Sequence, residues 1–398
     1  MNGPFFTILY LIYTYFLLLL VSNLFDGAGN YLIIPLTLAI AGIYLLATVA
    51  QGLYPNPITH FFASISEIWK GTSIYLFIFT IAMHIISWIV QIPNTVFIIV
   101  LFILVPLISV YAVYNANKIK INNINLSFDN LFEDLKFIHI SDLHIGAIRG
   151  DRLLNNIVNK INSNDLKDAD FAVITGDLAD GSSPIDSNSF KALANSKVPI
   201  FFTLGNHDFY PGIDDVIGAV ESANITVLSN QFVEIKGTQL LGIPFGREGI
   251  ISRPAKNIDS DSSNALHHLI NNGKNNEKNN EKINGKNNEW NIENNKDMNF
   301  KINIDFNKFL ILLHHVPVGW ELFKEIGVDL VLSGHTHGGQ FLPFNFLVKR
   351  VFPYIKGLYE DNGKYLFVSE GIGTLSPPMR LATTAEMAVF HLKKTNND

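Results

Sequence analysis

The chain has 398 residues, a formal net charge of −6 at pH 7 and no cysteine. The absence of cysteine excludes disulfides, thiolate metal sites and cysteine nucleophiles. The acidic balance, without a lysine or arginine cluster that could follow a phosphate backbone, argues against nucleic acid as a partner.

Four apolar stretches open the chain, and none of them contains Asp, Glu, Lys or Arg. Each has about the 20 residues that a helix needs to cross a bilayer. The first lacks the basic start and the cleavage site of a signal peptide, so we expect it to be retained. The stretches are residues 5–22, 31–50, 72–90 and 95–114. The sequence therefore predicts a four-helix transmembrane anchor at residues 1–116.

The lysines in the short loops predict how this anchor is oriented. Lys70 lies between the second and third stretches, and Lys118 and Lys120 follow the fourth. The loops at 23–30 and 91–94 contain neither Lys nor Arg. By the positive-inside rule, we expect an integral multi-pass membrane protein whose termini and remaining domain lie on the cytoplasmic side.

His84 lies inside the third stretch, where an ionisable side chain is by default a candidate for function. No acidic or basic partner occurs in any of the four stretches, so we favour a structural role. A transporter needs polar groups along a path, and His84 alone gives that hypothesis little support.

After residue 116 the hydropathy pattern changes to short apolar runs separated by polar segments, which is typical of a layered α/β domain. We assign residues 117–398 to this domain. Residues 271–300 interrupt it with a repeated Lys-Asn-Asn-Glu pattern. Such a composition buries too little apolar surface to fold, so we expect a disordered surface insertion there.

Five apolar runs of this domain end in polar clusters. Runs of this length are typical of buried strands, and residues 152–161 have the apolar spacing of a helix between the first two. The runs "LKFIHI", "FAVIT", "IFFTL", "FLILL" and "VDLVL" lead into Asp142 and His144, Asp177 and Asp180, Asn206 and His207, His314 and His315, and His335 and His337. Ligands of open α/β sheets bind beyond the carboxyl ends of the strands. We therefore expect the five clusters to meet at one edge.

The side chains at that edge are aspartate, asparagine and histidine, which suit Mn, Fe or Zn. Two Asp, one Asn and at least four His are too many for a single catalytic zinc, which needs about three protein ligands. Two divalent ions that share a bridging carboxylate would use the whole set. A metal pair of this kind promotes displacement at phosphorus.

With these blocks in place, the sequence resembles the calcineurin-like metallophosphoesterases, and in particular their membrane-anchored microbial phosphodiesterase branch. The resemblance covers about residues 133–392 and includes, in order, "SDLHIG", "GDLAD", "GNHD", "HHVP" and "GHTHGGQF". The tail "VSEGIGTLSPPMRL" is also similar to the closing segment of that branch. The resemblance implies an αββα sandwich of two packed sheets flanked by helices.

The resemblance also implies a role for each residue of these blocks. Asp142, His144, Asp177 and His337 would hold the first metal, and Asp177, Asn206, His315 and His335 the second. A hydroxide between the metals would attack the phosphorus, and His207 would protonate the leaving oxygen. The carboxylate of Asp180 would orient His207. Metal identity stays open among Mn, Fe and Zn.

Several histidines and one arginine need separate treatment. Adjacent strand residues face opposite ways, so only one of His314 and His315 is expected to bind metal, and His315 stands two residues before Pro317 as the family ligand does. His139 is expected in the core. Arg380 could contact a phosphoryl group or form a structural ion pair. His267 and His268, ahead of the insertion, are expected to be exposed.

The function that follows is metal-dependent hydrolysis of a phosphoester. Phosphodiesters are favoured over monoesters because the family branch favours them. Because the anchor holds the enzyme close to lipid, a lipid-linked phosphoester is a natural substrate hypothesis. The alternative is a non-catalytic metal-binding membrane adaptor or sensor, but such relatives are expected to have lost ligands that this chain keeps. Oligomeric state is open.

Overall fold

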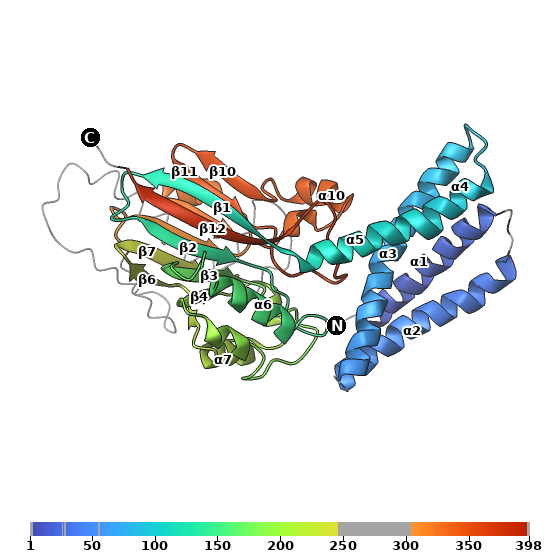
Figure 1. The fold of residues 1–398 in the computed structure, drawn as a ribbon, viewed down its shortest axis with the longest axis horizontal. Coiled ribbons are helices and arrows are strands. Elements are labelled where there is room, and N and C mark those ends of the chain that lie inside the picture. The colour runs from blue at the N-terminus through green and yellow to red at the C-terminus, as the bar shows by residue number, and fades with distance from the viewer. Residues whose placement is uncertain (1–2, 26, 28, 55, 246–303, 396–398) are drawn as a thin grey trace, which may run out of the picture. The chain divides into compact units, whose positions relative to one another are not determined.

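The computed structural model describes residues 3–25, 27, 29–54, 56–245 and 304–395. The expected insertion at 271–300, and the two histidines before it, lie outside the described residues. The chain forms two compact units. The helical unit comprises Met1–Asn117 together with Leu375–Leu381, and the α/β unit comprises Lys118–Thr374 and Ala382–Asp398. Figure 1 shows both units and labels many of their elements.

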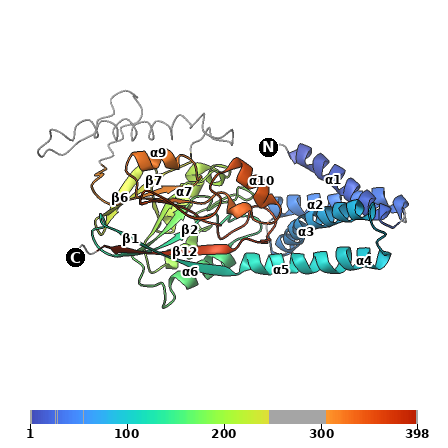
Figure 2. The ribbon, with the colours of Figure 1, turned by 90° about the horizontal axis from the view of Figure 1, so that it is seen from above.

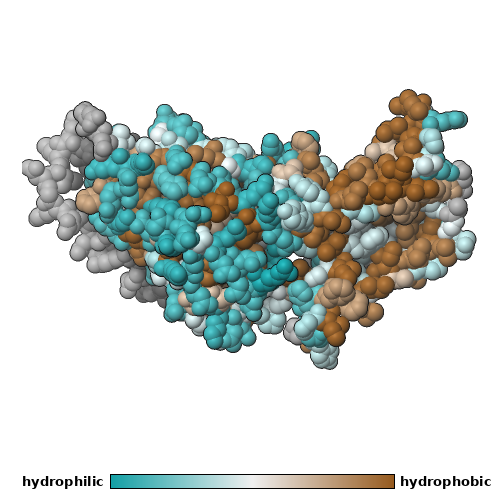
Figure 3. Space-filling view, in the orientation of Figure 1, coloured by the Kyte–Doolittle hydropathy of each residue, from teal (hydrophilic) through white to brown (hydrophobic). Residues whose placement is uncertain are grey.

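The helical unit is built from apolar helices. They are α1 (Gly3–Asn23), η1 (Asn30–Leu32), α2 (Ile33–Leu53), α3 (Pro57–Ser87), α4 (Asn94–Ile99), the π-helical turn η2 (Val100–Leu104) and α5 (Val105–Asn117). Three helices of the described chain are long and apolar enough to cross a membrane: Asn30–Leu53, Pro57–Ser87 and Asn94–Asn117. The first predicted stretch, residues 5–22, lies within α1 (Gly3–Asn23), which is not one of these three helices. Figure 3 shows apolar residues covering much of these helices, whereas hydrophilic residues predominate on the visible face of the α/β unit.

Helix α3 begins well before the predicted start of the third span at residue 72. The Asn56 side chain accepts hydrogen bonds from the backbone N–H groups of Ile58 and Thr59, and Thr59 bonds back to the N–H of Asn56. This capping box fixes the start of the helix. Lys70 therefore lies within α3, where it pairs with Glu67 at 2.6 Å, and its expected place in a loop is wrong.

A short segment near the C-terminus, Leu375–Leu381, belongs to the helical unit. The N–H of Arg380 donates to the carbonyl of Ala112 at 2.9 Å, and Asn115 Nδ2 donates to the carbonyl of Arg380 at 3.1 Å. Ser376 Oγ donates to Glu67 Oε2 at 2.7 Å. Both α3 and α5 thus hold a segment that is distant from them in sequence.

The α/β unit contains two six-stranded sheets. The first has the order β1-β12-β2-β3-β4-β5, and the second has the order β10-β11-β9-β8-β7-β6. The strands of the first sheet are β1 (Ile119–Phe128), β2 (Leu135–Ile140), β3 (Phe171–Thr175), β4 (Ile200–Thr203), β5 (Thr226–Val227) and β12 (Ala385–Lys394). The strands of the second are β6 (Gln231–Ile235), β7 (Thr238–Ile243), β8 (Leu310–His314), β9 (Leu330–Ser333), β10 (Gly357–Asp361) and β11 (Lys364–Val368). The helices are α6 (Asp151–Ile161), η3 (Lys191–Asn195), η4 (His207–Phe209), α7 (Ile213–Ser222), α9 (Trp320–Glu325), η5 (His337–Gly339) and α10 (Phe344–Val351).

The sheets pack face to face because their strands alternate two sets of apolar side chains. Phe137 and Phe171 of the first sheet share a buried cluster with Ile311 and Phe367 of the second. The opposite face of the first sheet packs on α6 and α7, and that of the second packs on α9. Figure 2 shows α6 and α9 on opposite outer sides of the strands. The predicted αββα sandwich is confirmed.

Strand direction decides where the polar clusters lie. Strands β2, β3 and β4 are parallel to one another, as are β8 and β9 in the second sheet. Parallel strands bring their carboxyl ends to the same edge of a sheet. This edge, which we call the metal edge, carries the loops that follow all five strands.

Candidate metal centre

The metal edge brings the predicted side chains together. Three groups of acidic and histidine side chains have ligand atoms within 4.8 Å of one another. They are Asp142, His144 and His337; His144, Asp177 and His207; and Asp177, His315 and His335. His144 and Asp177 each belong to two groups, so the three groups form one continuous cluster.

Distances within the cluster are short. The Nε2 atoms of His144 and His337 are 3.1 Å apart, and His337 Nε2 lies 3.5 Å from Asp142 Oδ1. Asp177 Oδ2 lies 3.1 Å from His315 Nε2 and 3.7 Å from His144 Nε2. Ligand atoms that share an ion at about 2.0–2.2 Å are separated by similar distances.

The backbone of the loops is unusual at these positions. Asp142, His144, Asp177, His335 and His337 have φ values of 54°, 50°, 53°, 70° and 50°. Residues other than glycine rarely adopt this left-handed conformation, which is typical of strained functional sites. All five residues belong to the cluster.

Glycines next to the carboxylates allow close approach. A Cβ on Gly205 would lie 2.3 Å from Asp177 Oδ1, and one on Gly334 would lie 2.3 Å from Asp142 Oδ2. Any other residue would displace the carboxylate, which explains why glycine precedes the asparagine of "GNHD" and the histidine of "GHTH".

Burial raises the free-energy cost of charged side chains in this cluster. Asp142 and Asp177 are 0% and 2% exposed. Burial lowers the pKa values of His144 and His335 to about 3, so both imidazoles are neutral at physiological pH. Burial opposes a charge on His315 as well, but the nearby carboxylate of Asp177 outweighs it and raises the pKa of His315 to about 10. Neutral imidazoles facing buried carboxylates provide ligands for a cation without first losing a proton.

The family comparison agrees with this geometry. Residues 135–339 match the family model described as calcineurin-like phosphoesterase. The chain belongs to the calcineurin-like phosphoesterase family.

Relatives of this phosphoesterase extend the comparison. A metallophosphoesterase of Helicobacter pylori is 29% identical over 281 residues, which cover 70% of this chain and 65% of that protein. A transmembrane protein with metallophosphoesterase domain from Bos taurus is 27% identical over 274 residues, which cover 65% and 53% of the two chains. The match thus spans less than two thirds of either relative. The NAD nucleotidase structure from Haemophilus influenzae aligns with a TM-score of 0.34 at 19% identity, over 61% of this chain and 46% of that one, which is too low to carry an argument.

The donor set of the phosphoesterase fits divalent ions. The ring of His315 is fixed by its Nδ1, which lies 2.7 Å from the carbonyl of Thr175 and leaves Nε2 facing the cluster. The buried Oδ1 of Asn206 has no hydrogen-bond partner among the described residues. A buried polar atom without a partner is costly, and a cation would satisfy it. Carboxylate, amide and imidazole donors suit Mn, Fe or Zn.

His207 lies at the rim of the cluster and is only partly buried. Its Nδ1 is 3.0 Å from the backbone carbonyl of Asp180, and its ring contacts Tyr210 edge to face at 4.8 Å. The Asp180 carboxylate instead accepts from the N–H and the hydroxyl of Ser182. The chain thus turns the carbonyl of Asp180 toward the ring of His207, and the expectation that Asp180 orients His207 stays a prediction.

Asp208 was not among the predicted residues, although it ends the "GNHD" block. It is fully buried, and it accepts from the N–H groups of Asp177, Ala179 and Gly205 at 2.7–2.9 Å. Burial and the charge of Asp177 raise its pKa to about 7. Its carboxylate ties the loops after β3 and β4 together beneath the cluster.

The remaining histidines lie elsewhere. His314 points to the outer face of the second sheet, where its ring contacts Phe323 at 5.6 Å, whereas His315 lies in the cluster. That His315 alone of the two binds metal stays a prediction. His139 is a core residue, as expected, with Nε2 2.7 Å from Thr175 Oγ1. His84 has Nδ1 3.0 Å from the carbonyl of Thr80 in its own helix. Arg380 belongs to the helical unit.

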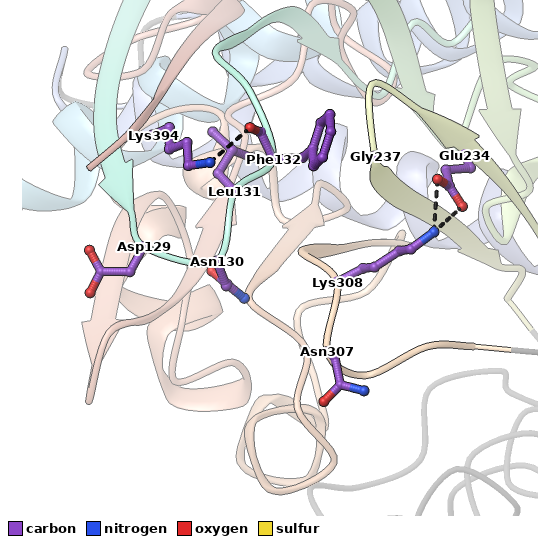
Figure 4. A pocket seen from close by; sticks show the side chains of 9 residues that line it. All are labelled: Asp129, Asn130, Leu131, Phe132, Glu234, Gly237, Asn307, Lys308 and Lys394. Atoms are coloured by element: carbon purple, nitrogen blue, oxygen red, sulfur yellow. Dashed lines mark hydrogen bonds and ion pairs between the residues drawn. The ribbon is translucent and has the colours of Figure 1, made fainter. Parts of the chain in front are cut away.

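A cavity of about 360 Å³ lies at the opposite edge of the phosphoesterase sheets (Figure 4). Its lining residues are Asp129, Asn130, Leu131, Phe132, Glu234, Gly237, Asn307, Lys308 and Lys394. Strand β12 runs antiparallel to β2, so its carboxyl end and that of its parallel neighbour β1 point away from the metal edge. We call this region the cavity edge, and it shares none of the predicted site residues.

Proposed function

We propose that this phosphoesterase binds two divalent ions, hydrolyses phosphodiesters and is tethered by residues 1–116 to a membrane. The position of Asp177 carries the proposal. Its carboxylate belongs to two of the three ligand groups and lies within 4 Å of imidazole nitrogens on both sides. A carboxylate so placed suits a bridge between two ions.

The proposed ligands follow from these groups together with the family resemblance. Asp142, His144, Asp177 and His337 would hold one ion, and Asp177, Asn206, His315 and His335 the other. When bound, the ions would lower the pKa of water toward neutrality and offset the negative charge of the phosphoryl oxygens. The N–H of His335 donates to both oxygens of Asp142, which keeps that carboxylate oriented.

His207 is the proposed proton donor to the leaving oxygen. The carbonyl of Asp180 accepts a hydrogen bond only from a protonated Nδ1. This leaves Nε2 as the atom that takes up and delivers the proton. The partial exposure of His207, at the rim of a buried cluster, supports contact with a substrate that enters from solvent.

Asp177→Asn in the full-length protein tests the two-ion proposal. Bound metal is measured by elemental analysis, and hydrolysis is measured with matched aryl phosphodiesters and monoesters. We expect kcat/KM to fall by roughly 10³-fold with loss of bound metal, because the bridge is removed. Undiminished hydrolysis would contradict the two-ion mechanism. If the unmodified protein binds metal but cleaves neither ester, it is an adaptor or sensor instead, and faster monoester cleavage would contradict the diester preference.

The proposed cytoplasmic location of the α/β unit rests on Lys118 and Lys120, which follow the last apolar helix. Because the chain has no cysteine, Phe132→Cys gives a single reactive thiol at a side chain that is 70% exposed. We expect a membrane-impermeant maleimide to label it only after cells are permeabilised. Labelling in intact cells would place the unit on the other side.

A further inference from the structure

Helix α10, Phe344–Val351, combines an apolar composition with the lack of any fully buried side chain. Five of its eight residues are Phe, Leu or Val, yet none of the eight is buried. Phe344, Leu347 and Val351 fall on one face at helical spacing and are 37%, 54% and 50% exposed. A helix with an apolar stripe normally covers a core. Here the stripe faces outward.

The helix is nevertheless firmly positioned at the metal edge. A Cβ on Gly339 would lie 2.3 Å from the Cα of Asn345, so the start of α10 packs directly on the "GHTHGG" loop. Beyond the helix, the ring of Phe352 contacts His335 at 5.3 Å. Thr336 Oγ1 donates to the carbonyl of Ile355 at 2.6 Å. Both ends of α10 are thus fixed to the loop that carries two of the proposed metal ligands.

The last turn of α10 carries two basic residues, Lys349 and Arg350. Both are exposed, and no carboxylate pairs with either one within the described chain. They lie on the side opposite Phe344, Leu347 and Val351, together with Phe346, which is 62% exposed. An apolar face opposed by basic residues is typical of helices that lie in the interface of an anionic bilayer. The described chain also has three helices long and apolar enough to span a membrane. A lipid bilayer is therefore the apolar environment that we consider for the exposed face of α10.

We propose that α10 is a lipid-contact helix that inserts its apolar face among membrane lipids beside the metal centre, and that the substrate is a phosphoester carrying long hydrocarbon chains. Lys349 and Arg350 attract the anionic headgroup region, while Leu347 and Val351 contact the chains. Because α10 is fixed to the loop of His335, a phosphoester at the lipid surface is presented to the ions. This inference rests on the proposed hydrolytic function and specifies its substrate class.

The activity test compares two substrates with the same leaving group. Full-length protein in bilayers of phosphatidylcholine and phosphatidylglycerol is assayed with ethyl and with hexadecyl p-nitrophenyl phosphodiesters. We expect the Leu347→Ser, Val351→Ser double variant to lower kcat/KM for the hexadecyl compound by about 10-fold and to leave that for the ethyl compound within about 2-fold. Phe132→Ser, at a side chain that is 70% exposed on the cavity edge, is the matched control and should change neither. Equal losses on both substrates, or none, would overturn the inference.

A second measurement separates lipid contact from catalysis. In the cysteine-free chain, Leu347→Cys and Phe132→Cys each accept a single spin label. We expect the label at 347, but not at 132, to be accessible to oxygen and protected from a water-soluble nickel reagent in bilayers. A water-exposed label at 347 would overturn the inference, as would a label shielded only after a protein partner is added. If the label lies in lipid and neither diester is cleaved, the proposed function fails while the lipid contact holds.

Discussion

The two edges of the α/β unit handle charge in opposite ways. At the cavity edge, Lys308 Nζ pairs with Glu234 at 2.8 Å, and both side chains are about half exposed to water. At the metal edge, the buried His315 lies 3.1 Å from Asp177 and 3.9 Å from Asp142, so one imidazole faces two carboxylates. Pairs of the first kind contribute little to stability. The second arrangement is costly without cations, because buried charges need full compensation. A buried histidine that faces several carboxylates therefore indicates the candidate metal centre better than the volume of a cavity does.

The largest contrast is expected between two neighbouring histidines. His315→Gln should lower kcat/KM at least ~100-fold and weaken metal binding, because it removes a proposed ligand that lies beside the carboxylate of Asp177. His314→Gln is the matched control, since it is equally a buried histidine but contacts Phe323 on the other face of the strand. It should change kcat/KM by less than about 3-fold. Similar losses in both variants would show that the damage is structural.

Asp208 should rank next, because it supports the metal edge without being a proposed ligand. Asn at this position has only one accepting oxygen for the three N–H groups that the carboxylate serves. We expect a loss of about 10- to 100-fold in metal affinity, which a metal titration of the full-length variant measures. Recovery of kcat at saturating metal would distinguish a positioning role from a catalytic one. An unchanged titration would contradict both.

A buried histidine away from the carboxylates should respond to acid. Burial lowers the pKa of His139 to about 3, against about 6.5 in the unfolded chain. The unfolded state therefore binds more protons below pH 6.5, and the stability associated with the neutral imidazole is lost as the pH falls from 6.5 toward 3. Between pH 7 and 5 the loss is about 2 kcal/mol for this residue. His139→Gln should flatten the pH dependence of the unfolding free energy by that amount, and an unchanged slope would contradict it.

The smallest effect is expected at the cavity edge. Lys308→Ala removes the ion pair with Glu234. Because exposed pairs of this kind contribute almost nothing measurable, neither the unfolding midpoint nor kcat/KM should change. Thermal unfolding and the aryl diester assay check this together. A marked fall in activity would mean that the two edges are coupled and that the contrast between them is wrong.

Much of the metal edge could be predicted from the sequence, because the apolar runs that form the strands and the polar motifs that follow them can both be recognised in it. Five apolar runs, each followed by Asp, Asn or His, were enough to bring the clusters together. The alternation of strand residues also separated His314 from His315. These inferences depend on the alternation of side chains along a strand and on which residues follow its carboxyl end. Both can be recognised in a single sequence.

Other features depend on backbone geometry that no spacing rule contains. The left-handed conformations of Asp142 and Asp177 arise from the loops as assembled, and the orientation of His207 by a carbonyl depends on how the chain turns after Asp177. Asp208 was overlooked because its partners are backbone N–H groups, which every residue offers. The start of α3 was misplaced because Glu67 and Lys70 lower the local hydropathy, although the Asn56 cap could have signalled it.

The segment Leu375–Leu381 limits how the N-terminal helices can be deleted or exchanged. Two residues before it, the N–H of Gly373 donates to the carbonyl of Asp142 at 2.7 Å, and the N–H of Ile372 donates to that of Ser141. A Cβ on Gly71 would meet Met379 Sδ at 2.4 Å, so α3 is shaped to receive this segment. Deleting the N-terminal helices would remove the partners of this segment in α3 and α5 while leaving it joined to the loop whose N–H groups contact Ser141 and Asp142. We therefore expect a chain with exchanged helices to fold only where α3 and this distant segment are exchanged together.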